Sequence, residues 1–411
     1  MATSGHIYWK YDEQLTRQNA ILDRETHPKR TRELIKRYQG HALTNGVSQV
    51  RVAKLAWGLR GLSKTLKKPL DNATQADIEV ALSTMLTTDI RPGKKPSLNT
   101  QRDRKRVVKQ FYRWLATQEE YEHDKNLTRL VEYLRREVKT PDPKRIHDPG
   151  NILTEEDVQR VLDKGCASEL ERALIVTLFE TGCRAGELLS IRICDITEET
   201  DLWAVRVNGK TGERTVPIVY AIPYLIRWLS VHPDRHNPNA LLWLKNTARG
   251  WGTPLNYVML RLIIKRCFTR AGVQKRNNPH WWRHTRCTLD AKDTSYTDSI
   301  LCAKMGHGPK VAARYRHMSA DDVKNAARRA AGIHVKEDAK KRPLLPQQCP
   351  ECQEVNTHDA RYCGKCGKPL TAKVIQEERD ALSKALEALP RILADPVLRA
   401  RYEEKLREIT G

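Results

Sequence analysis

Two short segments of the 411-residue chain each combine a cationic side chain with a group that can move a proton. In the first, Arg184 follows a glycine turn at a predicted helix start, and Glu187 comes three residues later, where it could brace the guanidinium. In the second, the i, i+3 spacing of His280 and Arg283 places both side chains on one face of a helix. Two guanidinium groups of this kind could hold an anion such as a phosphate.

A third segment is Met305-Gly-His307, with Tyr315 eight residues after the histidine. A phenolic hydroxyl can act as a nucleophile, and an imidazole can transfer a proton. Each segment also has an ordinary alternative. Arg-x-x-Glu on a helix is usually a surface ion pair, and a lone tyrosine or histidine is usually structural. The segments are therefore informative mainly in combination.

Four cysteines form two C-x2-C pairs separated by ten residues: Cys349, Cys352, Cys363 and Cys366. Two such pairs can present four thiolates to one Zn²⁺ in a tetrahedron, which leaves no open coordination position. We therefore predict a structural zinc site with the pattern of a zinc ribbon, with unligated thiols or a redox pair as the alternatives. The remaining cysteines are scattered and are predicted to be packing residues: Cys166, Cys183, Cys194, Cys267, Cys287 and Cys302.

The chain carries 73 Lys and Arg residues against 50 Asp and Glu residues, a formal net charge of +23. This surplus predicts a polyanionic partner: nucleic acid first, an anionic membrane second, with a solvated basic surface as the remaining alternative. The surplus lies on residues 1–372, mostly before residue 341, whereas the tail from residue 373 is balanced. The sequence has neither an apolar run of about 18 residues nor an apolar signal core. We expect a cytoplasmic, nucleoid-associated protein with reduced cysteines.

Hydrophobic periodicity predicts a mainly α-helical protein with a small antiparallel β-sheet. We expect a helical domain, a Pro-rich linker, a second domain with a β-hairpin, the cysteine cluster and a helical tail interrupted at two prolines, at residues 1–140, 141–150, 151–340, 345–372 and 373–411. One predicted helix of this first domain, residues 97–117, carries basic side chains on the side opposite its apolar residues. Its basic side is predicted to face DNA phosphates through Arg102, Arg104, Lys105, Arg106 and Lys109.

The predicted hairpin joins strands 202–207 and 214–219 through a six-residue turn that contains Lys210. Its Gly-Lys-Thr sequence is similar to the end of a phosphate-binding loop. The first glycine of such a loop would fall at Ala204, so that alternative fails.

Taken in order, these segments resemble the active-site boxes of the tyrosine recombinases, the family of the phage-type integrases, over nearly all of residues 45–330. The family has an arginine, a hairpin lysine, an H-x-x-R box, a histidine or tryptophan after glycine, and a nucleophilic tyrosine. The matching positions are Arg184, Lys210, His280, Arg283, His307 and Tyr315. The departures are Trp282 and Met305, where leucine is common, and a tyrosine one residue nearer to the histidine than usual.

The resemblance implies a SAM-like core-binding domain that clamps DNA, followed by an α+β catalytic domain. It also implies transesterification at a DNA phosphodiester, with Tyr315 as nucleophile and a 3′-phosphotyrosyl intermediate. In this scheme Arg184 and Arg283 stabilise charge on the phosphate, Lys210 protonates the leaving 5′ oxygen, and His280 assists proton transfer from the tyrosine. No catalytic metal or ATP is expected.

In the same scheme His307 binds the phosphate or orients the site. The implied partner is double-stranded DNA at attachment sites, bound by a homotetramer on two synapsed duplexes, with a monomer in solution also compatible. The zinc ribbon resembles those of archaeal integrases, which implies integration or excision of a mobile element or viral genome.

Three alternatives remain open. They are a chromosome-dimer resolving recombinase, a type IB topoisomerase-like enzyme, and a non-catalytic DNA-binding regulator. The regulator would have a decayed active-site position, and the sequence has none. Tyr296 is the nearest rival nucleophile, but it precedes the Gly-His pair.

Overall fold

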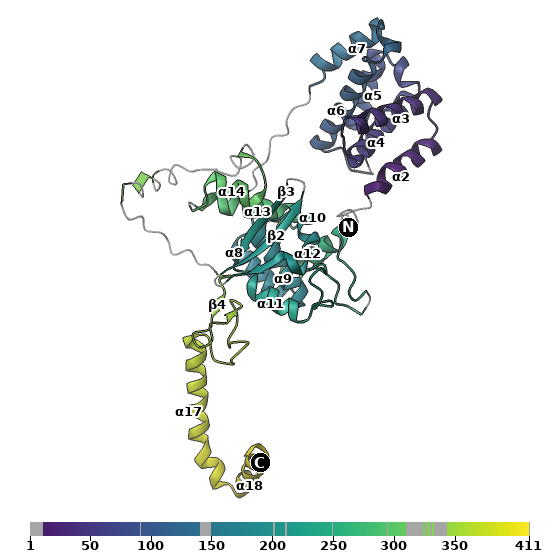
Figure 1. Cartoon of the computed structure of the whole chain (residues 1–411). Helices are drawn as coiled ribbons and strands as arrows, with labels where there is room; N and C mark the ends of the chain where they lie inside the picture. Colours follow the sequence, from purple (N-terminus) through teal and green to yellow (C-terminus); the bar gives the residue numbers. More distant parts are fainter. Residues whose placement is uncertain are drawn as a thin grey trace. The chain divides into compact units, whose positions relative to one another are not determined.

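The computed structural model of the chain is drawn in Figure 1. It describes residues 11–90, 92–139, 149–199, 202–209, 212–248, 250–293, 295–309, 324, 327, 328, 331, 332 and 343–410. The chain divides into two compact units, residues 1–147 and 148–411. None of the described helices has both the length and the apolar character that crossing a membrane requires.

The first unit is a bundle of amphipathic helices around one apolar core. Its described elements are α2 (Tyr11–Arg24), α3 (Lys29–Thr44), α4 (Gln49–Leu66), η1 (Leu70–Asn72), α5 (Gln75–Thr87), α6 (Leu98–Leu115), η2 (Glu119–Tyr121) and α7 (Lys125–Arg136). Leu59 of α4 and Phe111 of α6 are fully buried in this core. Thr74 and Asp77 form a capping box at the start of α5, as their spacing predicts.

The second unit is also mainly helical, and the part before the cysteine cluster contains a small sheet. Its elements before the cysteine cluster are η3 (Pro149–Asn151), α8 (Glu155–Arg160), the π-helical turn η4 (Val161–Gly165), α9 (Glu169–Thr181), α10 (Ala185–Ser190), η5 (Ile193–Asp195), β1 (Ile196–Glu198), β2 (Trp203–Gly209), β3 (Gly212–Ile218), α11 (Ile222–Ser230), α12 (Tyr257–Ala271), α13 (Pro279–Lys292) and α14 (Asp298–Met305). The predicted fold class, mainly α with a small antiparallel sheet, is confirmed.

The sheet has the order β1-β2-β3 with antiparallel pairing. The predicted hairpin is present, but its pairing continues to Gly209 opposite Gly212, so the connection is shorter than the predicted six-residue turn. Strand β1 was not predicted, because three residues are too few to establish an alternating pattern.

Helix α9 is almost entirely buried, and one of the departures from the family pattern packs against it. Trp282 of α13 is fully buried. Its ring makes edge contacts with Phe179 of α9 and Phe268 of α12, with ring centroids 6.4 and 5.6 Å apart. The indole therefore fills core space between three helices, and its position fixes α13, which carries His280 and Arg283.

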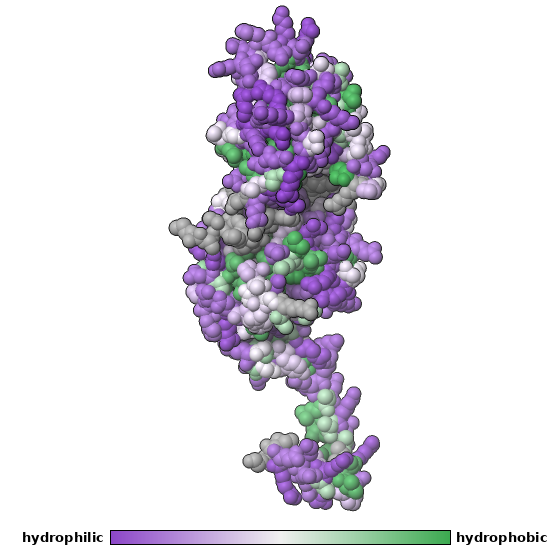
Figure 2. Space-filling model, turned by 90° about the vertical axis from the view of Figure 1, so that its right-hand side faces the viewer, coloured by the Kyte–Doolittle hydropathy of each residue, from purple (hydrophilic) through white to green (hydrophobic). Residues whose placement is uncertain are grey.

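The cysteine cluster and the tail complete the second unit, with elements β4 (Gln347–Gln348), β5 (Val355–Asn356), α17 (Ala372–Ala394) and α18 (Pro396–Thr410). We expected Pro390 to interrupt the tail helix, but α17 continues through it. This is possible because the carbonyl oxygen that the proline leaves without an N–H donor lies on an exposed helix, where water can reach it. Leu382 and Leu386 are 62% and 59% exposed, and apolar surface is visible on the tail at the lower end of Figure 2.

Candidate active site

Arg184 stands at the junction of two helices. Gly182 ends α9 with a φ of +55°, and a Cβ at this position would lie 2.8 Å from the Cβ of Arg286. Arg184 is the N-cap of α10, and its Nη1 donates to Glu187 Oε1 at 2.6 Å. The backbone N–H of Arg184 donates to the other carboxylate oxygen at 2.9 Å. The predicted bracing of Arg184 by Glu187 is therefore confirmed.

Arg283 reaches the same place from α13. Its side chain is buried, with Nη1 donating to the carbonyl oxygen of Gly182 at 3.1 Å and Nη2 donating to the carbonyl oxygen of Met305. Arg184 Nη2 donates to the next carbonyl, that of Gly306, at 3.2 Å. The carboxyl end of α14 thus holds both guanidinium groups, and the partial negative charge of a helix C-terminus suits them.

The convergence of two cations has an electrostatic cost. Burial lowers the pKa of Arg283, and repulsion from Arg184 lowers it further. The guanidinium stays protonated at neutral pH because its ordinary pKa is above about 12. An anion placed between the two groups would relieve their repulsion, so the arrangement is suited to bind a phosphate.

His307 follows α14 directly after Gly306, whose φ of +59° ends the helix. Burial lowers the pKa of the imidazole, and the nearby charge of Arg283 lowers it further. The ring is therefore neutral near pH 7, when it can both donate and accept a hydrogen bond. His280 lies in the first turn of α13 with its side chain exposed, 4.5 Å from the ring of His284.

The end of the β-hairpin lies against the Arg184–Glu187 pair. A Cβ added at Gly209 would lie 2.4 Å from Glu187 Oε1, so this position needs glycine. Lys210 is the next residue in the chain. Lys210 and Tyr315 both lie outside the described residues, so their predicted roles stay predictions.

Two buried ion-pair groups were missed by sequence reasoning. Arg214 on β3 donates to Glu187 at 2.7 Å and to the carbonyl oxygen of Lys304 at 2.8 Å. Asp290 on α13 pairs with Lys304 at 2.8 Å and with Arg286 at 2.6 Å. Together, Arg214 and Asp290 join the hairpin, α13 and α14 around Arg184 and Arg283.

A family model described as the phage integrase family matches residues 151–320. The matched stretch contains the site built above and the predicted nucleophile Tyr315. Residues 151–320 belong to the phage integrase family. The resemblance to the tyrosine recombinases is thereby confirmed for this domain.

Named relatives agree with this assignment. The chain is 32% identical over 161 residues to tyrosine recombinase XerH of Campylobacter jejuni, covering 38% of this chain and 43% of that protein. It is 28% identical over 203 residues to tyrosine recombinase XerA of Saccharolobus solfataricus, covering 48% of this chain and 62% of that protein. The chain thus spans about half the length of the curated relatives it matches.

Solved structures show the fold. A crystal structure of XerH bound to a palindromic difH substrate aligns with a TM-score of 0.51 at 18% identity, covering 77% of this chain and 94% of that one. A lambda integrase tetramer bound to a Holliday junction aligns with a TM-score of 0.51 at 16% identity, covering 70% and 78%. The chain therefore has the tyrosine recombinase fold.

Outside the recombinase domain, α6 carries the predicted basic face. Arg106 is exposed, and Lys105 and Arg113 lie close enough to Lys109 to lower its pKa, after the effect of burial. Arg104 differs, because its guanidinium donates to the carbonyl oxygen of Met85 and lies 5.9 Å from the ring of Trp57. Arg102 is half-buried.

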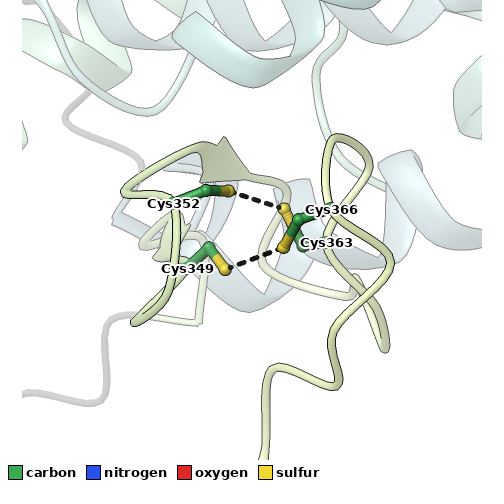
Figure 3. Close-up of side chains that lie close together, drawn as sticks. All are labelled: Cys349, Cys352, Cys363 and Cys366. Atoms are coloured by element: carbon green, nitrogen blue, oxygen red, sulfur yellow. Dashed lines mark hydrogen bonds between the residues drawn. The ribbon is translucent and has the colours of Figure 1, made fainter.

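The four predicted metal ligands come together, as Figure 3 shows. Their sulfur atoms all lie within 4.8 Å of one another, and the Cys349–Cys366 and Cys352–Cys363 pairs are 3.5 Å apart. The backbone N–H groups of Cys366 and Lys365 lower the pKa of Cys363 to about 6. This cluster could hold a metal ion.

The cysteine module is packed on the recombinase domain. The hydroxyl of Tyr224 on α11 lies 2.7 Å from His358 Nδ1, and His358 Nε2 lies 3.4 Å from Asp163. Among the six other cysteines, Cys194 is exposed, which differs from its predicted packing role. Cys166, Cys183, Cys267 and Cys287 are buried as predicted.

Proposed function

We propose that this protein is a site-specific DNA recombinase, an integrase, that cleaves and rejoins DNA through a 3′-phosphotyrosyl intermediate. The observation that carries the proposal is the convergence of Arg184 and Arg283 at the end of α14, beside His307, within a phage integrase domain. The naming of relatives as tyrosine recombinases supports the same activity.

In the proposed reaction the two guanidinium groups bind the non-bridging oxygens of one DNA phosphate. Tyr315 attacks the phosphorus, and the bond to the 5′ oxygen breaks as the tyrosyl bond forms. Lys210 donates a proton to the leaving oxygen, and His280 assists removal of the tyrosine proton. The phosphotyrosine conserves the bond energy, so attack by a 5′ hydroxyl rejoins the strand without ATP. The residues proposed to act on the phosphate supply the charge stabilisation through cations, and the scheme needs no catalytic metal.

The proposal is tested by trapping the intermediate. The full chain is incubated with a library of duplexes that carry one nick inside a randomised segment, so that the short cleaved fragment diffuses away and rejoining is prevented. We expect a covalent protein–DNA adduct on a denaturing gel, with the nucleotide attached to Tyr315 in peptide mass spectra. Attachment to Tyr296, or bound duplexes without any adduct, would contradict the mechanism.

We further propose that the enzyme integrates or excises a mobile element or viral genome. Transposase A of transposon Tn554 from Staphylococcus aureus is among its relatives, 23% identical over 185 residues. The alternative, a chromosome-dimer resolving recombinase, is supported by the relatives named XerH and XerA. Plasmids carrying the cleavage sequences selected above separate the two functions. Joining of two separate plasmids favours the integrase, whereas exclusive resolution of two sites on one plasmid favours the resolvase.

The partner is double-stranded DNA, bound by the helical unit as well as by the recombinase domain, and a homotetramer on two synapsed duplexes would perform strand exchange. The lambda integrase tetramer on a Holliday junction supports this assembly. The place of action would be the cytoplasm, with the protein on the nucleoid.

The basic face of α6 leads to a prediction about salt. Lys105, Lys109 and Arg113 follow each other at four-residue spacing, so they line one side of the helix. Lys109→Ala should lower the slope of log K against log salt by about one, because one phosphate contact is lost. Lys125→Ala, at the exposed start of α7, is the control and should leave the slope unchanged. DNA titrations followed by fluorescence anisotropy at several salt concentrations measure the slope for each variant. Equal slopes for wild type and Lys109→Ala would contradict the placement of α6 at the DNA interface.

Zn²⁺ is the metal that best fits the cysteine cluster. A tetrahedral ion bound at about 2.3 Å from each thiolate would separate the sulfurs by roughly 3.8 Å, close to the 3.5 Å of the two nearest pairs. The four ligands would close the coordination sphere, so the metal would stabilise the module without taking part in strand transfer.

We expect about one zinc per chain in metal analysis of freshly purified protein. Cys363→Ser should lower this content strongly and increase hydrogen exchange in residues 343–371, because metal binding and folding of such modules are coupled. Cys302→Ser, on α14, is the matched control and should keep the zinc. If wild-type protein contains no zinc and residues 343–371 are still as well protected from hydrogen exchange as in a folded module, the cluster is not a metal site.

A further inference from the structure

A buried thiol lies beside His307. Cys287 is on α13, one turn after Arg283, and is fully buried. Its Sγ lies 3.8 Å from His307 Nε2, within hydrogen-bond distance for sulfur. From the sequence, this cysteine was predicted to be a packing residue, and the contact with His307 indicates a second role.

The thiol is held in place by the packing of two helices. Cys287 forms a small apolar cluster with Ala291 of α13 and with Leu301 and Met305 of α14. The carbonyl oxygen of Met305 in turn accepts the hydrogen bond from Arg283. Cys287 therefore joins the helix that carries Arg283 to the chain segment that carries His307.

The protonation states give the contact a direction. Burial raises the pKa of Cys287 to about 11, so the group is a neutral S–H donor at neutral pH. Burial and the charge of Arg283 lower the pKa of His307, so the imidazole is neutral and one ring nitrogen is an acceptor. Two neutral groups allow either S–H···Nε2 or Nε2–H···S. Because an imidazole nitrogen is a better acceptor than a thiol sulfur, the first arrangement is favoured, and it places the ring proton on Nδ1.

We propose that Cys287 is a positioning residue that fixes the ring orientation of His307 and holds it in the Nδ1–H tautomer. Its importance for strand cleavage rests on the function proposed above. Its effect on the imidazole does not, because the contact is present in the protein without DNA.

The first test is NMR on the full chain without DNA, with ¹⁵N-labelled histidine and with His307→Gln to assign the resonances. Wild type should show His307 mainly as the Nδ1–H tautomer. Cys287→Ala should shift His307 toward a mixture of the two tautomers. It should also raise the pKa of His307, because the S–H donor stabilises the neutral ring and the variant lacks it. Cys287→Ser should retain the wild-type tautomer, because the hydroxyl is also a donor of similar size.

Cys302→Ala is the matched control, because it removes a thiol that packs against the same cluster from α14. This variant should leave the tautomer unchanged. Identical tautomer and pKa of His307 in wild type and Cys287→Ala would overturn the proposal. If Cys287→Ala does not fold, either of two other results would overturn the proposal. One is a wild-type protein in which His307 is not mainly the Nδ1–H tautomer. The other is a pKa of His307 in wild type and Cys287→Ser that equals that of a histidine in an unfolded peptide.

The second test is the single-turnover rate of adduct formation against pH. Cys287→Ala should be slower by about tenfold, the lower end of what hydrogen-bond partners of metal-bound histidines contribute, and Cys287→Ser should recover most of the rate. The pH dependence of the Ala variant should follow the raised pKa of His307. A wild-type protein that forms no adduct contradicts the recombinase proposal alone, because the NMR result stands without DNA.

Discussion

Replacing Arg283 with lysine is expected to slow adduct formation by about 10²–10³-fold, the usual cost of losing one donor to developing negative charge. The reason lies in the geometry of its hydrogen bonds. One terminal nitrogen donates to the Gly182 carbonyl at 3.1 Å and the other to the Met305 carbonyl. A planar fork can hold both carbonyls and still present N–H groups to a phosphate, whereas a single ammonium group cannot.

The rate is measured in single turnover with saturating nicked duplex, so that weaker DNA binding does not contribute. Tyr315→Phe gives the baseline without adduct. Arg206→Lys is the matched control, because Arg206 is a half-exposed arginine of β2 that pairs with Asp195 at 2.7 Å. A folded Arg283→Lys protein that reacts within about twofold of wild type would show that Arg283 is structural and does not act on the phosphate, since a lost donor costs far more.

Local features of the site and fold were predictable from sequence. The bracing of Arg184 by Glu187 depends on a three-residue spacing at a helix start, and the structure has that contact. The same holds for the capping box of Thr154 and Asp157 at the start of α8. Such interactions involve neighbours in the chain, so spacing and side-chain chemistry are sufficient to predict them.

Contacts between distant segments were not predictable in the same way. Arg214 is separated from Glu187 by 27 positions, and Asp163 from His358 by far more. These pairs exist because the hairpin packs on α10 and because the cysteine module packs on α11. Arg214 did leave a signal, since it alternates with the buried Val216 and Ile218 along β3 and so points inward.

The convergence of both arginines on α14 has a further physical cause. Helix α14 ends at Gly306 in a left-handed conformation, which exposes the last carbonyl oxygens at one point. Sequence motifs identify which residues belong to the site, but the acceptors that hold them are backbone atoms and carry no residue signature. This is also why Cys287 could be interpreted only as a packing residue until its distance to His307 was known.

Glu187→Gln is expected to lower the free energy of unfolding of the recombinase domain by about 3 kcal/mol at pH 7. Glu187 is 2% exposed and accepts hydrogen bonds from Arg184 and Arg214 at 2.6 and 2.7 Å. Burial alone would raise the pKa of this carboxyl, but the bonds from Arg214 and Arg184 outweigh it and lower the pKa from 4.5 to about 2. The charged form is thus favoured in the folded state by the free energy that corresponds to this shift.

The sign of the pKa shift determines the pH dependence. A carboxyl whose pKa is lower in the folded state stabilises the protein above its unfolded pKa, and this contribution is lost as the pH falls through the folded pKa. For Glu187 the stabilisation is complete above pH 4.5 and is lost progressively toward pH 2. The glutamine variant lacks the titrating group, so its stability should fall less steeply than that of wild type across this window.

Hydrogen exchange of peptides from α9 and α10, followed in increasing denaturant, measures the opening of this domain separately from the helical unit. The matched control is Glu213→Gln, which removes an exposed carboxylate from β3 beside Arg214 and should change the unfolding free energy by less than about 0.5 kcal/mol. Equal stability of wild type and Glu187→Gln from pH 7 to pH 3 would contradict the prediction, because it would mean that the charge of Glu187 makes no net contribution to stability. Two uncompensated guanidinium groups would instead repel each other, and the site would then lose activity together with stability.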